Sequence, residues 1–161
     1  IKMLAGALVI VPAWASLTTL HDYGDRGPVL TLILMMMVWL ADIGAYFAGR
    51  QWGRTKLAPA VSPGKTWQGV YGGMFSSLLF AALAGWWFSG SLQWTLAFMT
   101  VSLLAVMFSV AGDLIESLMK RHSGIKDSGS LIPGHGGVFD RIDSLVAAAP
   151  LFLIGFLWLG L

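Results

Sequence analysis

Cysteine is absent from this chain of 161 residues, and charged residues make up only 11% of it. Without cysteine there is neither a disulfide framework nor a thiolate metal site, so a metal needs oxygen or imidazole ligands. The charged content lies far below the roughly 25% of ordinary soluble domains, and the mean hydropathy is +0.75. These deficits argue against a soluble domain and indicate an integral membrane protein.

Long uncharged runs fill most of the chain. Segments long enough to cross a bilayer are residues 3–20, 29–49, two within 66–112 that are separated by a break at 88–93, and 144–161. Asp42 interrupts the second segment, and a carboxylate there either faces a cavity or reaches water at the interface. We predict an all-α fold, a polytopic transmembrane helical bundle of about five spans, as a single domain over residues 1–161.

The basic residues predict an orientation. The polar segments 50–67 and 113–143, together with Lys2, hold nine of the ten Lys and Arg residues, and only Arg26 falls on the opposite side. The two polar segments are expected to be loops, and by the positive-inside rule both are expected to face the cytoplasm. The chain starts with Ile and has no signal-peptide pattern at its beginning, so we expect a C-terminal fragment of a longer chain.

Five of the eight carboxylates lie in the segment 113–143. Apolar runs adjoin both of its ends, so this charged segment is expected where the membrane meets water. If the preceding helix continues past Asp113, then Glu116 or Ser117, and also Lys120, share one face with it. Chemistry is therefore expected at this face.

Asp140 and Asp143 fall three residues apart on the first turn of the last predicted span. With Asp113 they can bring three carboxylates together across two helix ends, and such hard oxygen ligands suit Mg²⁺. We predict that Asp113, Asp140 and Asp143 hold Mg²⁺, with a second cation as an option. The alternative is that Asp140 forms an interfacial salt bridge with Lys120 or Arg141.

Two glycine-containing segments have the character of anion sites. The glycines around His135 in PGHGGVFD supply backbone N–H groups near a helix start, where phosphate binds readily, although a lone His is more often structural. The segment SPGKTW (62–67) offers Lys65 and the hydroxyls of Ser62 and Thr66, yet it departs from the P-loop pattern. Taken alone, the segment indicates a solvated loop.

Residues 117–143, which end in IPGHGGVFDRID, closely resemble the signature of phosphatidate cytidylyltransferases, also called CDP-diacylglycerol synthases. The segments SPGKTWQG and ADIGAYFAGR also resemble that family. The resemblance implies a polytopic enzyme that joins CTP to phosphatidic acid, releases pyrophosphate and gives CDP-diacylglycerol. The expected partners are CTP, phosphatidic acid and the lipid bilayer of a bacterial inner membrane. A homodimer is left open, and no nucleic acid is expected.

Site roles follow from these segments. The residues predicted to bind the nucleotide are Ser62, Lys65, Thr66 and Asp42. Those predicted to act on the phosphates are Lys120, Arg121, Lys126, His135 and Arg141. Two rivals remain: a CTP-dependent lipid-alcohol kinase, and a transporter that uses Asp42 and the interfacial acids.

Overall fold

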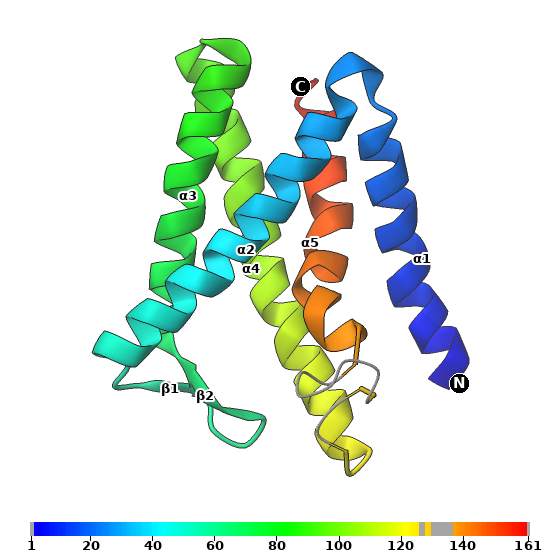
Figure 1. Cartoon of the computed structure of the whole chain (residues 1–161), viewed down its shortest axis with the longest axis vertical. Helices are drawn as coiled ribbons and strands as arrows, with labels where there is room; N and C mark the ends of the chain where they lie inside the picture. The colour runs from blue at the N-terminus through cyan, green and yellow to red at the C-terminus, as the bar shows by residue number, and fades with distance from the viewer. Residues whose placement is uncertain (1, 126–127, 130–136, 161) are drawn as a thin grey trace.

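The structure is a computed structural model that describes residues 2–125, 128–129 and 137–160, without the side chains of residues 2–5. Its elements, shown in Figure 1, are five helices, a 3₁₀ turn and a hairpin of two strands. The helices are α1 (Lys2–His21), α2 (Gly27–Trp52), α3 (Trp67–Ser89), α4 (Leu92–His122) and α5 (Phe139–Trp158). The turn is η1 (Gly24–Arg26), and the strands are β1 (Lys56–Ala58) and β2 (Ser62–Thr66).

The helices have the length and composition of membrane spans. Within the described residues, four spans are long and apolar enough to cross a membrane, and they correspond to α2, α3, α4 and α5. The described apolar part of α1, Gly6–His21, is shorter. Large apolar side chains face outward, with Phe75 70% and Leu83 65% exposed, as expected for contact with lipid. The chain is an integral membrane protein with the predicted helical fold class.

The helices α3, α4 and α5 run side by side, and α2 crosses them diagonally (Figure 1). Buried side chains such as Met37 of α2, Phe98 of α4 and Phe152 of α5 form one apolar core between them. Small residues let α2 and α3 approach closely, because a Cβ at Gly72 would lie 2.2 Å from the Cβ of Ala48. This packing brings the ends of the helices together at one side of the bundle.

The expected boundary between the third and fourth spans is confirmed. The α3 helix ends at Ser89, and Gly90 takes the left-handed conformation (φ +63°) that glycine adopts without strain. The α4 helix begins at Leu92 and continues to His122, past the predicted end of the span at residue 112. The first part of the predicted polar segment is therefore helical, as the shared face of Asp113 and Lys120 requires.

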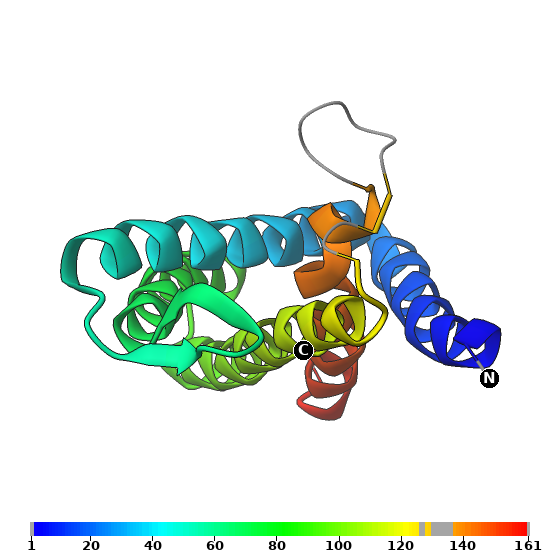
Figure 2. The same ribbon diagram turned by 90° about the horizontal axis from the view of Figure 1, so that it is seen from below.

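The segment 50–67 was expected as a loop, and this expectation is wrong in part because it contains an antiparallel hairpin. Lys56 of β1 lies opposite Thr66 of β2, and Ala58 lies opposite Ser62. Strands this short are not predicted by an alternation of apolar and polar residues in the sequence. Their formation depends instead on packing at the base of the hairpin. The hairpin lies at the same end of the bundle as the last turns of α2 and α4 (Figures 1 and 2).

Candidate active site

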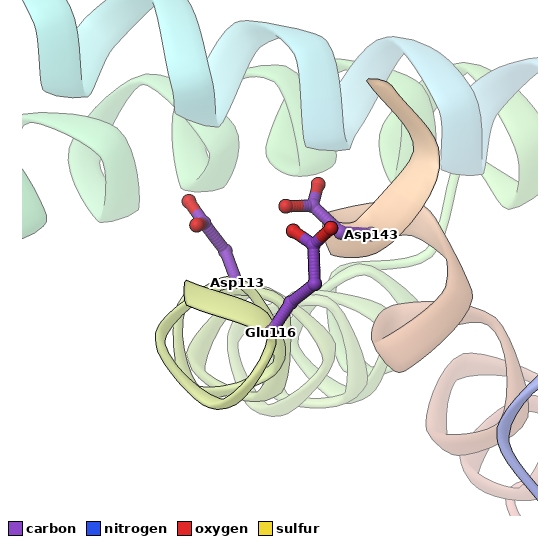
Figure 3. A group of neighbouring side chains, drawn as sticks. All are labelled: Asp113, Glu116 and Asp143. Carbon is purple, nitrogen blue, oxygen red and sulfur yellow. The ribbon is translucent and has the colours of Figure 1, made fainter. Parts of the chain in front are cut away.

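Three carboxylates converge where α4 meets α5. Asp113 and Glu116 lie one turn apart on α4, and Asp143 lies near the start of α5. Each offers an oxygen, and the three oxygens lie within 4.8 Å of one another. Figure 3 shows the carboxylates of Glu116 and Asp143 close together, with the carboxylate of Asp113 set apart from them. Among the described residues, this acidic triad (Asp113, Glu116, Asp143) has the ligand type and spacing of a site for a hard cation.

A close contact between helices places the acidic triad. A Cβ at Gly112 would lie 2.3 Å from the Cβ of Ala147, so only glycine permits this approach of α4 to α5. Gly112 directly precedes Asp113, and Ala147 follows Asp143 by about one helical turn. The two helix surfaces that carry the acidic triad are therefore held against each other.

Glu116 is the least solvated member of the triad. The residue is 8% exposed, and neither carboxylate oxygen accepts a hydrogen bond among the described residues. The Lys120 ammonium lies 3.1 Å from Oε2 as an ion-pair partner, but without hydrogen-bond geometry. Buried polar groups normally have partners, and crowded buried carboxylates repel one another. The donor set therefore fits a divalent cation, which would balance the crowded negative charge.

The structure does not bring Asp140 into this group of three oxygens. Its Oδ1 accepts a hydrogen bond from Lys120 Nζ at 2.9 Å, and its Oδ2 accepts from the backbone N–H of Gly137 at 2.7 Å. The backbone N–H of Ser128 donates to Oδ2 at 3.0 Å. This geometry matches the salt-bridge alternative for Asp140, and Glu116 is the residue that lies beside Asp113 and Asp143. The signal for Glu116 was its spacing of three residues from Asp113 on one helix face.

The hairpin places the ammonium group of Lys65 beside the acidic triad. Lys65 of β2 forms an ion pair with Asp113, and both side chains are about a quarter exposed. The next residue, Thr66, is buried, and its hydroxyl caps α3 by accepting from the backbone N–H of Gly69 at 3.1 Å. Thr66 therefore caps α3, and Lys65 lies beside the acidic triad. Ser62 lies at the start of β2.

Of the other residues predicted to act on the phosphates, three lie among the described residues and two do not. Lys120 is held between Glu116 and Asp140, and the Arg121 Nε donates to the carbonyl of Val61 in the hairpin at 3.5 Å. Arg141 lies exposed on α5 near the acidic triad. The predictions for Lys126 and His135 lie outside the described residues.

Two cavities meet at Asp113, one member of the acidic triad. The first, of about 500 Å³, lies between α2, α3 and α4 and has an apolar wall that includes Val70, Met74 and Val106, with Lys65 at its polar part. The second, of about 600 Å³, is lined by charged side chains that include Lys120, Asp140 and Arg141. Both cavities are lined by Asp42, Asp113 and Ser144. The structure therefore brings Asp42 of α2 to the same place as Asp113, as the sequence predicted.

These features define an integral membrane protein with an acidic centre, flanked by lysines, at one end of a helical bundle. The chain belongs to the cytidylyltransferase family, whose sequence profile matches residues 2–159. The family resemblance read from residues 117–143 is confirmed.

Curated relatives give the same classification. The chain is 50% identical over 147 residues to a phosphatidate cytidylyltransferase of Pseudomonas aeruginosa, an alignment that covers 91% of this chain and 54% of that protein. It is 51% identical over 130 residues to a phosphatidate cytidylyltransferase of Haemophilus influenzae, with 79% of this chain and 45% of that protein covered. A relative of the same name from Synechocystis sp. is 47% identical over 128 residues, which are 78% and 42% of the two chains. The chain thus spans about half the length of the curated relatives it matches.

Proposed function

We propose that this chain forms the catalytic part of a phosphatidate cytidylyltransferase, which transfers the cytidylyl group of CTP to phosphatidic acid. The observation that carries the proposal is the acidic triad with a lysine on either side, Lys65 from the hairpin and Lys120 from α4. It lies at the junction of two cavities whose sizes suit small-molecule ligands. Family membership and the names of the relatives support this choice of reaction.

The reaction needs positioning and charge neutralisation more than proton transfer. The phosphate of phosphatidic acid is already an anion near neutral pH, so one of its oxygens can attack the α-phosphorus of CTP without a strong base. The new P–O bond gives CDP-diacylglycerol, while the bond from the α-phosphorus to the bridging oxygen breaks and releases pyrophosphate. Lys65, Lys120 and Arg141 line the cavities where these negative charges would gather.

Mg²⁺ is the cation that we propose for the acidic triad. Asp113, Glu116 and Asp143 supply carboxylate oxygens, and the crowding of the buried Glu116 beside two further carboxylates supports this ligand set. When bound, Mg²⁺ would neutralise negative charge on the triphosphate. Lys120 holds Glu116 and Asp140 at its two sides, so it would keep the triad oriented before the substrates arrive.

The membrane is proposed to be a bacterial inner membrane, with this end of the bundle facing the cytoplasm. Nine of the ten Lys and Arg residues fall on this side of the predicted topology, and the relatives are bacterial proteins. A site at this depth can be reached by a soluble nucleotide from the water and by a lipid headgroup from the bilayer.

The direct test uses the full-length protein in oriented membrane vesicles, with labelled CTP outside and phosphatidic acid in the membrane. Inverted vesicles are expected to form labelled CDP-lipid and pyrophosphate only when Mg²⁺ is present, and right-side-out vesicles are expected to form none. Release of CDP together with an unlabelled phospholipid would instead show a CTP-dependent kinase. Product formation in intact right-side-out vesicles alone would reverse the proposed orientation.

Lys65→Ala is expected to raise the KM for CTP about 10-fold or more, because one charge-assisted contact to a phosphate is lost. The KM for phosphatidic acid should change much less. Lys56→Ala, which removes an exposed lysine of β1, is the matched control. Initial rates over a series of CTP concentrations measure the effect. Equal changes in both KM values, or none, would remove Lys65 from nucleotide binding.

A further inference from the structure

We infer that Gln68 is a positioning residue, which fixes the base of the hairpin and thereby sets the place of Lys65. Gln68 lies in the first turn of α3 and is half-buried. Its side-chain oxygen Oε1 accepts hydrogen bonds from two consecutive backbone N–H groups, those of Arg54 at 3.1 Å and Thr55 at 3.2 Å. These two residues lead from the end of α2 into β1.

The contacts of Gln68 close the base of the hairpin. The N–H of Trp67 donates to the carbonyl of Thr55 at 3.0 Å. Thr55 is therefore bound through both of its backbone groups, its carbonyl by Trp67 and its N–H by Gln68. Lys56 of β1 pairs with Thr66 of β2 immediately beyond this point. The Gln68 side chain therefore ties the segment that enters β1 to the first turn of α3, which directly follows β2.

The hairpin reaches the acidic triad through few contacts beyond its base. Lys65 pairs with Asp113, and the Arg121 Nε lies 3.5 Å from the carbonyl of Val61, which is a long contact on an exposed side chain. A two-stranded hairpin alone is only marginally stable in water. Its orientation therefore depends on its base, and a small rotation there would move Lys65 away from Asp113.

The two hydrogen bonds of Gln68 are exposed, so water can replace them with little loss of stability. Loss of orientation is a different matter, because misplacing a substrate-binding group by about 1 Å can cost on the order of 10²-fold in rate. Gln68 is therefore expected to affect the use of CTP much more than folding. This part of the inference rests on the proposed function.

Two variants of Gln68 and one control distinguish the effect of the acceptor oxygen from the effect of side-chain volume. Gln68→Met keeps length and volume without an acceptor, and we expect it to raise the KM for CTP about 5-fold with little effect on the KM for phosphatidic acid. Gln68→Glu keeps the acceptor and is expected to restore the wild-type KM, since a carboxylate is also favourable in the first turn of a helix. Gln51→Met, at an exposed glutamine near the end of α2, is the control and should leave both KM values unchanged.

A double mutant tests whether Gln68 acts through Lys65. Gln68→Met combined with Lys65→Ala should be no worse than Lys65→Ala alone, because a misplaced lysine and a missing lysine have the same consequence. If the two effects multiply, or if Gln68→Glu behaves like Gln68→Met, the inference is overturned.

A readout independent of catalysis keeps the inference separate from the proposed function. These 161 residues contain no cysteine, so once any cysteine elsewhere in the full-length protein has been replaced, nitroxide labels can be attached at Ala60→Cys in the hairpin turn and His122→Cys at the end of α4, both exposed positions. Pulsed electron spin resonance on the full-length protein should give a distance distribution that is broad in Gln68→Met and narrow in the unmodified background and in Gln68→Glu. An unchanged distribution in Gln68→Met would overturn the inference even if the protein proved to have another activity.

Discussion

Glu116→Gln is expected to reduce turnover by about 10²-fold or more and to raise the Mg²⁺ concentration needed for half-maximal rate. Gln keeps the size of the side chain and one acceptor oxygen but removes the negative charge that would hold the cation. The loss is comparable to removing one strong electrostatic contact with the transition state. Because Glu116 is buried beside Asp113 and Asp143, its neutralisation also removes repulsion.

The same variant should therefore be at least as stable as the wild type when Mg²⁺ is absent. Initial rates over a Mg²⁺ series, together with thermal unfolding in detergent with and without Mg²⁺, measure both consequences. Asp25→Asn, at an exposed carboxylate in η1 at the other end of the bundle, is the control and should change neither. A folded Glu116→Gln protein with wild-type rate and unchanged Mg²⁺ requirement would remove the metal site from the acidic triad.

The members of the triad should also behave as one unit. Glu116→Gln combined with Asp143→Asn is expected to be scarcely worse than the more damaged of the two single variants, because a site that has lost one essential ligand has little function left to lose. Independent effects that multiply would show that these carboxylates do separate tasks.

Asp140→Asn is expected to reduce turnover by a similar factor, about 10²-fold, but with an unchanged Mg²⁺ requirement. Asp140 accepts hydrogen bonds from Lys120 Nζ and from the backbone N–H groups of Ser128 and Gly137. Asn has one acceptor oxygen in place of two, and its NH₂ group faces donors that it cannot bind. Lys120 and the start of α5 should lose their orientation, and misplaced groups cost rate on this scale.

Stability distinguishes this variant from Glu116→Gln. Losing charge-assisted hydrogen bonds at a side chain that is only 12% exposed should lower the free energy of unfolding by about 2 kcal/mol. Thermal unfolding and the Mg²⁺ dependence of the rate are the measurements, with Asp22→Asn as an exposed control. If Asp140→Asn raised the Mg²⁺ requirement as Glu116→Gln is expected to do, Asp140 would be a metal ligand after all, as the sequence alone suggested.

The membrane class and the approximate positions of the spans could be predicted from local features. Uncharged runs predict membrane spans because placing a charge in lipid is costly, and this cost depends on each segment alone rather than on its neighbours. The break at Gly90 was predictable for the same reason, since a run as long as 66–112 must turn and the glycine marks the place. That Asp113 and Lys120 share one helix face could also be predicted, because it follows from the helical repeat alone.

The partners of each charged group were decided by the tertiary structure. Asp140 and Glu116 both lie within reach of Lys120. Their spacing in the sequence does not show that Asp140 accepts hydrogen bonds from backbone N–H groups, or that Glu116 accepts none among the described residues. The choice follows from the contact of Gly112 with Ala147, which fixes how α4 meets α5. It also follows from the loop amides that surround Asp140.

The hairpin shows the same division. Its composition identified Lys65 as a cation near the acidic segment, but strands β1 and β2 are too short for a sequence pattern. They form because Thr66 caps α3 and Gln68 holds the chain that leaves α2, and these contacts join residues brought together by the packing of α2 against α3. The sequence by itself determined a membrane bundle with charged chemistry at one end. The packing of its helices decided which side chains meet there, because their contacts depend on distances that no local pattern records.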